Sequence, residues 1–271
     1  MKTENLERAI ERMTKKTGVS FSNCFEDFLD AALATLCNNP NQRQKDLIRK
    51  LDASKSMMEA FKEAMTEYGA AAEGFSDPLG EVFMNRISHG EHGQYFTPEH
   101  VCEMMALAVN PGKDTICDPA CGSGRMLLAS LKVCRQADKE PILYGNDLSS
   151  TCAKMTLLNL LVNTAKGEVT CGDALLDTTA YRMFYHIDRI HIGQYLVSTY
   201  WQYDQSDVEE VNNQRNAWIV NLLNEGLIVE RTDKAETISL SEIVNDKPVK
   251  TETLTAKPKT AAIQLDLFNN E

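Results

Sequence analysis

The sequence predicts an α/β protein, a class in which strands and helices alternate along the chain. Three observations carry this prediction. A short apolar run at residues 115–117 leads into an acidic, glycine-containing turn and then into a helical pattern at residues 125–131. A second strand-like run, residues 142–147, also ends in a carboxylate. Ahead of both, apolar residues recur at helical spacing, which adds an amino-terminal helical region to the predicted sheet.

The amino-terminal region, residues 1–74, is expected to be helical and separate from the sheet. Apolar side chains recur there at helical spacing in three stretches, which run from Leu6 to Met13, from Phe21 to Leu36 and from about Ser54 to Gly69. Residues 38–41, Asn-Asn-Pro-Asn, break the pattern. Basic residues at 43–50 alternate with acidic and apolar ones, which indicates a solvated helical face.

The turn at residues 118–124, Asp-Pro-Ala-Cys-Gly-Ser-Gly, is the most informative stretch of the chain. Its glycines allow the backbone to turn tightly and to approach a ligand where a Cβ atom would clash. A strand, an acidic residue, a glycine turn and a helix, in this order, build a nucleotide pocket at the carboxyl edge of an α/β sheet. We therefore expect a nucleotide-like ligand at this turn.

The same heptapeptide resembles motif I of the S-adenosylmethionine-dependent amino-methyltransferases that act on DNA. The nearest resemblance is to the adenine-N6 modification (M) subunits of type I restriction-modification systems. Three further segments are similar to family motifs in the family order: Asp-Pro-Leu-Gly-Glu-Val-Phe at 77–83, Gly-Gln-Tyr-Phe-Thr-Pro at 93–98 and Val-Thr-Cys-Gly-Asp-Ala-Leu at 169–175. The resemblance implies a Rossmann-like S-adenosylmethionine-binding domain, which we place at residues 75–231.

By this resemblance the cofactor is S-adenosylmethionine, and each motif contacts one part of it. The segment 93–98 closes over the methionine end, and Asp147 accepts both ribose hydroxyls, as a carboxylate can in bidentate geometry. The third motif contacts the adenine ring through Asp173 or the neighbouring backbone. The expected cofactor-binding residues are Tyr95, Phe96, Thr97, Asp118, Ala120, Gly122, Gly124, Asp147, Leu148, Asp173 and Ala174.

The catalytic motif of the family is missing. Adenine-N6 methylases carry Asn/Asp-Pro-Pro-Tyr/Phe at the end of a strand, where two acceptors hold the amino group of the flipped base. The strand expected to carry this motif is residues 187–195. There Ile192 replaces the Asn, Gly193 and Gln194 replace the prolines, and Tyr195 alone remains. Because Ile cannot accept a hydrogen bond, we predict a degenerate site with no intact catalytic residue.

The chain after Tyr195 has only a brief ordered pattern. Residues 207–225 show helical spacing, and Gly226 is placed to end that helix. Residues 227–231 are expected to form one more strand. Counting strand-like runs gives about five strands. The sheet is therefore predicted to be incomplete and to expose an edge that needs cover.

The composition favours a cytoplasmic protein. No apolar run approaches the length of a membrane span, and the first residues lack the apolar stretch of a signal peptide. The eight cysteines are scattered, and no metal site is predicted, since Cys117 lies on a strand and Cys121 in the turn. A formal net charge of −11 argues against binding of duplex DNA by this chain alone. By the resemblance, a separate specificity subunit recognises the DNA target, and other modification subunits are possible partners.

The last segment, residues 232–271, is predicted to be a flexible tail because it is rich in Lys, Thr, Glu, Asp and Pro. It ends in a peptide, residues 264–268, that resembles the Gln-Leu-x-Leu-Phe motif by which bacterial proteins dock on the replication sliding clamp. The partner-binding residues by this resemblance are Gln264, Leu265, Leu267 and Phe268. Two interpretations stay open: the tail docks on a partner, or it folds back on the open edge of the sheet.

Together these features predict a truncated relative of the type I modification subunit that binds S-adenosylmethionine without catalysing methyl transfer on its own. One alternative is an active adenine-N6 methyltransferase whose site is completed by an unusual loop or a partner chain. Another is a non-enzymatic accessory of DNA modification, or of a mobile element, that docks through its carboxyl-terminal peptide.

Overall fold

The structure is a computed structural model, and it describes residues 2–88, 95–109, 114–176, 181–192, 195–225 and 229–230. The helices are α1 (Lys2–Thr17), α2 (Phe21–Ala34), α3 (Gln42–Asp52), α4 (Lys55–Ala72), α5 (Pro78–Phe83), the π-helix η1 (Met84–Ser88), α6 (Glu99–Val109), α7 (Arg125–Gln136), α8 (Ser150–Val162) and α9 (Val208–Asn224). The strands are β1 (Thr115–Asp118), β2 (Ile142–Asp147), β3 (Lys166–Cys171), β4 (Met183–Ile192), β5 (Tyr195–Tyr203) and β6 (Val229–Glu230).

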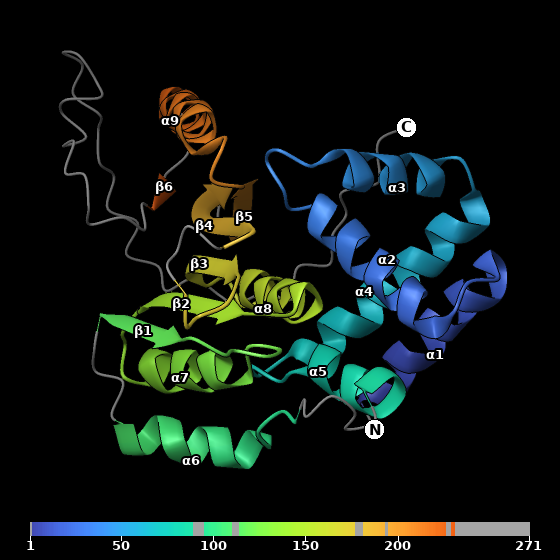
Figure 1. Ribbon diagram of the computed structural model, residues 1–271, viewed down its shortest axis with the longest axis horizontal. Helices are drawn as coiled ribbons and strands as arrows, with labels where there is room; N and C mark the ends of the chain where they lie inside the picture. Colours follow the sequence, from blue (N-terminus) through green and yellow to red (C-terminus); the bar gives the residue numbers. More distant parts are fainter. Residues whose placement is uncertain are drawn as a thin grey trace.

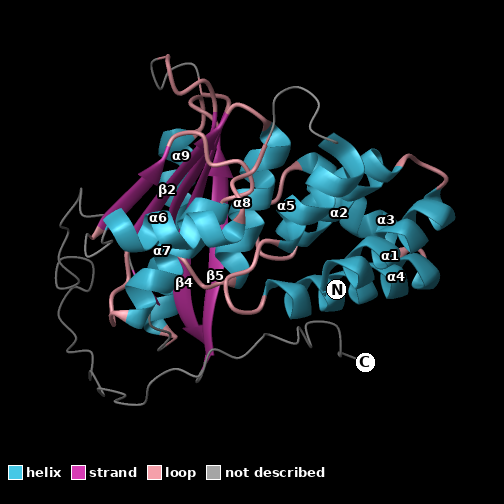
Figure 2. Cartoon of the chain, turned by 90° about the horizontal axis from the view of Figure 1, so that it is seen from below, coloured by secondary structure: helices cyan, strands magenta, loops and turns pink. Residues whose placement is uncertain are grey.

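One sheet joins all six of these strands, in the order β1-β2-β3-β4-β5, with β6 paired to β4 (Figure 1). The first three strands are parallel and are connected through α7 and α8, which is the arrangement predicted from the alternation of strand and helix. The α/β class with an amino-terminal helical region is thus confirmed. Figure 2 shows the strands side by side with helices packed along them.

The second half of the sheet reverses direction. β4 runs antiparallel to β3, and β5 runs antiparallel to β4 as a hairpin whose last register pair is Ile192 with Tyr195. The single strand expected at residues 187–195 is therefore wrong: β4 starts at Met183, and Tyr195 belongs to the next strand. The sheet has six described strands instead of about five, because the hairpin splits one apolar run into two strands.

The amino-terminal helices share one core with the sheet. Phe25, Phe28 and Phe61 of the bundle lie in the same buried cluster as Leu127 of α7 and Ile187 of β4. Helices α2, α4 and α5 all contact α8, which lies between the bundle and the strands (Figure 1). In the described residues, the helical region and the sheet therefore pack against each other. The boundary near residue 74 marks a change of sequence motif, and the hydrophobic packing continues across it.

β1 lies at an edge of the sheet in the described part of the chain, with β2 as its one ladder partner. Next to it, α6 packs on α7 through a small cluster of Cys102, Ala106 and Ala129. The other side of α6 exposes large apolar side chains, namely Met104, Met105, Leu107 and Val109. None of the described helices is long and apolar enough to cross a membrane.

Candidate cofactor site

Three polar loops meet at one edge of the sheet. Because β1, β2 and β3 are parallel, their carboxyl ends fall at the same edge, and the loops that follow them begin side by side. β1 ends at Asp118, β2 ends at Asp147, and β3 is followed by Asp173. The strand ends predicted to bind the cofactor are therefore brought together by the fold.

Asp147 ties the second loop to the glycine turn. Its Oδ2 atom accepts a hydrogen bond of 2.9 Å from the backbone N–H of Gly122, and its Oδ1 atom accepts one of 2.9 Å from the N–H of Ser149. Two backbone donors thus fix the carboxylate at the mouth of the turn. The remaining acceptor capacity of the two oxygens can receive ligand hydroxyls.

Asp118 is the second carboxylate of the site. Burial raises its pKa, the nearby charge of Asp147 adds to the rise, and a hydrogen bond from the N–H of Ala120, 3.2 Å long, opposes it. Two carboxylates that repel each other across a turn favour a ligand that carries positive charge or hydroxyl donors. This preference follows from the charges alone.

Phe96 covers the glycine turn. Gly122 has a φ of 57°, and a Cβ atom built there would lie 2.8 Å from the ring atom Cε1 of Phe96, closer than van der Waals contact allows. The ring is held from behind by Phe83, whose centroid is 5.8 Å away in a stacked arrangement. Its neighbour Tyr95 is three-quarters exposed. Phe96, from the segment predicted to close over the cofactor, therefore lies on the turn.

Asn146, which the sequence analysis did not select, joins all three loops. Its Nδ2 donates to the carbonyl oxygens of Pro119, at 3.2 Å, and Gly172, at 3.0 Å. Its Oδ1 accepts from the hydroxyl of Thr170 at 2.8 Å. A buried amide needs such partners. An asparagine inside a mainly buried strand, one residue before Asp147, was the signal available in the sequence.

Several apolar side chains beside these loops face solvent. Leu148, Leu175 and Leu176 are 64%, 93% and 58% exposed, and Ala174 is exposed as well. Asp173 caps its own loop by accepting a 2.9 Å hydrogen bond from the N–H of Leu175. Exposed leucines at the carboxyl edge of a sheet offer a flat apolar contact for a planar ring.

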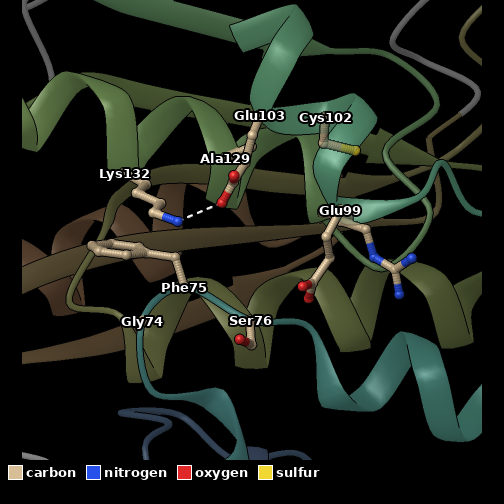
Figure 3. A pocket seen from close by; sticks show the side chains of 9 residues that line it. Gly74, Phe75, Ser76, Glu99, Cys102, Glu103, Ala129 and Lys132 are labelled. Carbon is tan, nitrogen blue, oxygen red and sulfur yellow. Dashed lines mark hydrogen bonds and ion pairs between the residues drawn. The ribbon is translucent and has the colours of Figure 1, made fainter. Parts of the chain in front are cut away.

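A small pocket lies on the other side of the glycine turn, between α6, α7 and residues 74–76 (Figure 3). Its volume is about 100 Å³, and its charged lining residues have partners: Lys132 contacts Glu103, Arg125 contacts the buried Asp77, and Glu99 accepts a hydrogen bond from the N–H of Asp77. None of the predicted cofactor residues lines it. The pocket is too small for a nucleotide-sized ligand.

Tyr195 lies at the opposite end of the sheet from the three loops. In the antiparallel register Met183 pairs with Cys171 at the loop edge, and Ile187 pairs with Gly167. From Met183 to Ile192 the strand covers roughly 30 Å at about 3.3 Å per residue. The strand aligned with the family's catalytic motif therefore runs away from the three loops, because it is antiparallel to β3.

Other predicted positions lie outside the described residues, namely Gly193, Gln194, Gly226 and the tail peptide at 264–268. For Ile192 the structure describes the backbone, which forms the last pair of the β4–β5 ladder, but not the side chain. Among the residues that the structure does describe, no group of three or more His, Cys, Asp or Glu side chains is placed to hold a metal ion.

Similar proteins fall in one functional class. The chain is 25% identical over 166 residues to the type I restriction enzyme MpnII methylase subunit of Mycoplasma pneumoniae, a match that covers 59% of this chain and 30% of that protein. It is 32% identical over 117 residues to the MjaVIII methylase subunit of Methanocaldococcus jannaschii, covering 39% of this chain and 20% of that one. The chain thus spans less than a third of these relatives.

A solved structure from Listeria monocytogenes, described as a class I S-adenosylmethionine-dependent methyltransferase, aligns with a TM-score of 0.46 and 15% identity, over 65% of this chain and 55% of that one. The profile of the N-6 DNA Methylase family matches residues 77–220, which is more than half of the chain and contains the glycine turn, Asp147 and Asp173. The chain belongs to the N-6 DNA methylase family.

Proposed function

We propose that this chain binds S-adenosylmethionine at the loops after β1, β2 and β3 and does not transfer a methyl group to DNA by itself. One observation supports the binding part above all. Asp118 and Asp147 flank a glycine turn at the ends of adjacent parallel strands, and Phe96 lies over that turn.

The chemistry of S-adenosylmethionine suits this arrangement. Its sulfonium and ammonium groups are cationic, which suits a site with two carboxylates, because a cation would offset the repulsion by Asp147 that helps to raise the pKa of Asp118. Its ribose supplies two hydroxyl donors for Asp147. Its adenine ring can lie against exposed apolar side chains such as Leu148 and Leu175. We assign the methionine end to Phe96 and Thr97, next to Asp118.

Isothermal titration with S-adenosylmethionine tests this assignment. Asp147→Ala should weaken binding by roughly 1–3 kcal/mol, as for a hydrogen bond to a charged acceptor. Glu59→Ala is the matched control, because it removes an exposed carboxylate from α4 without touching the site. The absence of binding heat for the wild-type protein at millimolar cofactor would reject the proposed function.

The lack of autonomous methyl transfer is proposed from the missing tetrapeptide. Without two acceptors for the amino group of the target adenine, the nitrogen lone pair is not oriented toward the methyl group. An unpaired buried donor would also cost roughly 1–3 kcal/mol. Incubation of purified protein with DNA and tritiated S-adenosylmethionine should leave the DNA unlabelled. Label incorporation that disappears with Asp147→Ala would contradict this part of the proposal.

The second candidate is a methyltransferase completed by a partner chain. It is favoured by the edge position of β1, next to the glycine turn, and by the exposed apolar side of α6. By analogy with the type I relatives, the partners would be other modification subunits and a specificity subunit that brings DNA. The test adds a type I methylase subunit inactivated in its own glycine turn. DNA labelling that needs both chains supports this candidate, and its absence rejects it.

For the carboxyl-terminal peptide we propose two alternatives: it docks on a sliding clamp, or it folds back on its own domain. If it docks on a sliding clamp, a synthetic peptide of the last ten residues should bind a purified bacterial clamp. Changing Leu267 and Phe268 to Ala should abolish that binding, because these two side chains would supply most of the apolar burial. If the peptide instead covers the domain, deleting residues 260–271 should lower the melting temperature.

A further inference from the structure

Asp77, at the start of α5, is a fully buried carboxylate at the centre of a hydrogen-bond network. Its Oδ1 atom accepts from the N–H of Gly80 at 2.9 Å and from Nδ2 of Asn159 at 2.8 Å. Its Oδ2 atom accepts from the hydroxyl of Ser123 and from Nε of Arg125, the latter at 3.0 Å. Four donors, one of them the cationic Arg125, offset the cost of burying this charge.

The network reaches both parts of the proposed cofactor site. Ser123 lies in the glycine turn, and Arg125 is the first residue of α7. Nη1 of Arg125 also donates to the carbonyl oxygen of Thr97 at 3.1 Å, in the segment that covers the turn. Through Ser123 and Arg125, one buried carboxylate therefore fixes the turn and its cover relative to each other.

Asn159, on α8, is the second link. Its Nδ2 donates to the carbonyl oxygen of Ser123 at 2.9 Å as well as to Asp77, and its Oδ1 accepts from the hydroxyl of Tyr68 at 2.9 Å. Tyr68 lies on α4 of the amino-terminal bundle. The helical region thus supports the glycine turn through a chain of buried hydrogen bonds.

The close packing around Asp77 requires glycine at position 80. A Cβ atom there would lie 2.1 Å from Oδ2 of Asp77 and 2.5 Å from the hydroxyl oxygen of Ser123. The first turn of α5 therefore approaches the carboxylate and the glycine turn as closely as backbone can. Close packing of this kind holds a binding loop in one geometry before the ligand binds.

We infer that Asp77 is a positioning residue for the cofactor. It holds the Ser123 end of the glycine turn and the Thr97 segment in the arrangement that receives the methionine end of S-adenosylmethionine, and it does so through Ser123 and Arg125. This inference rests on the proposed function. Asp77 itself is fully buried, so it acts by preorganising the loops, which lowers the ordering cost of binding.

The test compares S-adenosylmethionine with adenosine, which lacks the methionine end. Asp77→Asn replaces one carboxylate oxygen by an amide N–H₂, which cannot accept the hydrogen bonds that Asp77 receives. We expect this change to weaken S-adenosylmethionine binding about tenfold, as for the loss of a hydrogen bond to a charged group. Adenosine affinity, measured by competition, should stay unchanged. Ser123→Ala should show the same selectivity with a smaller loss. Ser198→Ala is the control for Ser123→Ala, because it removes a buried hydroxyl hydrogen bond on β5, outside this network.

Each outcome decides the inference. Wild-type affinity for S-adenosylmethionine in Asp77→Asn, or equal losses for both ligands, overturns it, because a merely structural role predicts no selectivity. If Asp77→Asn does not fold, Ser123→Ala decides by the same comparison. If the wild-type protein binds no cofactor, the proposed function fails, and amide hydrogen exchange then decides. Exchange at residues 119–125 should be faster in the variant than in wild type while α2 is unchanged, and equal exchange rejects the inference.

Discussion

The two halves of the sheet use polar residues in opposite ways. In the parallel half, β1 to β3, the carboxylates Asp118 and Asp147 stand at strand ends, where loops and solvent meet. In the antiparallel half, Asp188 and Arg189 lie inside β4 and are buried. Polar groups at strand ends leave acceptor capacity for a ligand, whereas Asp188 and Arg189 are paired with Arg215 and Glu140 of other segments.

The buried network of the antiparallel half fastens α9 to the sheet. Arg215 of α9 donates to both carboxylate oxygens of Asp188, each at 2.6 Å. His186 lies between Asp188, at 3.6 Å, and Glu168, at 2.9 Å. These contacts join α9, β4 and β3, so this half contributes anchoring while the parallel half contributes the site.

The largest expected effect is the loss of Arg215. Arg215→Ala leaves the carboxylate of Asp188 buried without its bidentate partner, and we expect the free energy of unfolding to fall by about 3–5 kcal/mol. Urea denaturation measures it. Arg8→Ala, which removes an exposed ion pair with Glu4, should cost under about 1 kcal/mol. Cofactor affinity of the folded variant should match wild type, and a parallel loss of affinity would show that the two halves are coupled.

The next effect is a pH dependence of stability centred on His186. Burial disfavours its charged form, but hydrogen bonds with Asp188 and Glu168 outweigh burial and raise its pKa to about 9. The unfolded value is about 6.5. A folded pKa above the unfolded one means that the stabilisation is complete below about pH 6.5 and is lost as the pH rises toward 9.

Urea unfolding at several pH values checks this. The free energy of unfolding of the wild-type protein, relative to that of His186→Gln, should fall by up to about 3 kcal/mol between pH 6 and pH 9. Arg215, whose charge opposes protonation of His186, is present in both proteins and cancels in the difference. A difference that does not change with pH would mean that the pKa of His186 is the same in the folded and the unfolded protein.

The parallel half was predictable from the sequence because its signals are local. Asp118, Gly122 and Gly124 form one strand–turn–helix unit, and Asp147 ends the next strand, so no distant contact is needed to find them. Asn146 was missed, and Asp77 was noted only as the start of a family motif, because their partners are distant in sequence, such as Gly172 for the first and Asn159 for the second. Their roles depend on tertiary contacts.

The antiparallel half was predicted poorly for a related reason. A strand-like segment such as residues 187–192 indicates a strand but contains no information about its direction. The reversal at β4 is decided by pairing with β3, and the hairpin is closed by β5, so neither follows from the segment itself. Similarity to a motif aligned Ile192 and Tyr195 with the family's catalytic tetrapeptide, whereas the register puts their backbone at the end of the sheet away from the three loops.

A smaller effect is expected in the parallel half from Gly122→Ala. The residue would adopt a left-handed backbone, which costs about 1–2 kcal/mol, and its Cβ would press on Phe96. Because Phe96 covers the turn, we expect weaker S-adenosylmethionine binding by titration calorimetry. Gly69→Ala on α4 is the matched control, since its Cβ meets nothing within 4 Å. It should raise stability by about 0.5–1 kcal/mol and leave binding unchanged.

The smallest expected effect is that of Tyr195→Ala, and it separates the structural placement from the motif alignment. If Tyr195 were the aromatic residue of a catalytic motif, its side chain would stand beside the cofactor. The register instead places it at the far end of β4, where it is half exposed. We therefore expect unchanged cofactor affinity and a stability change within about 0.5 kcal/mol. Phe96→Ala, measured in the same titration, should weaken binding. A reduced affinity in Tyr195→Ala would mean that the hairpin folds toward the cofactor edge, and the contrast between the two halves would be lost.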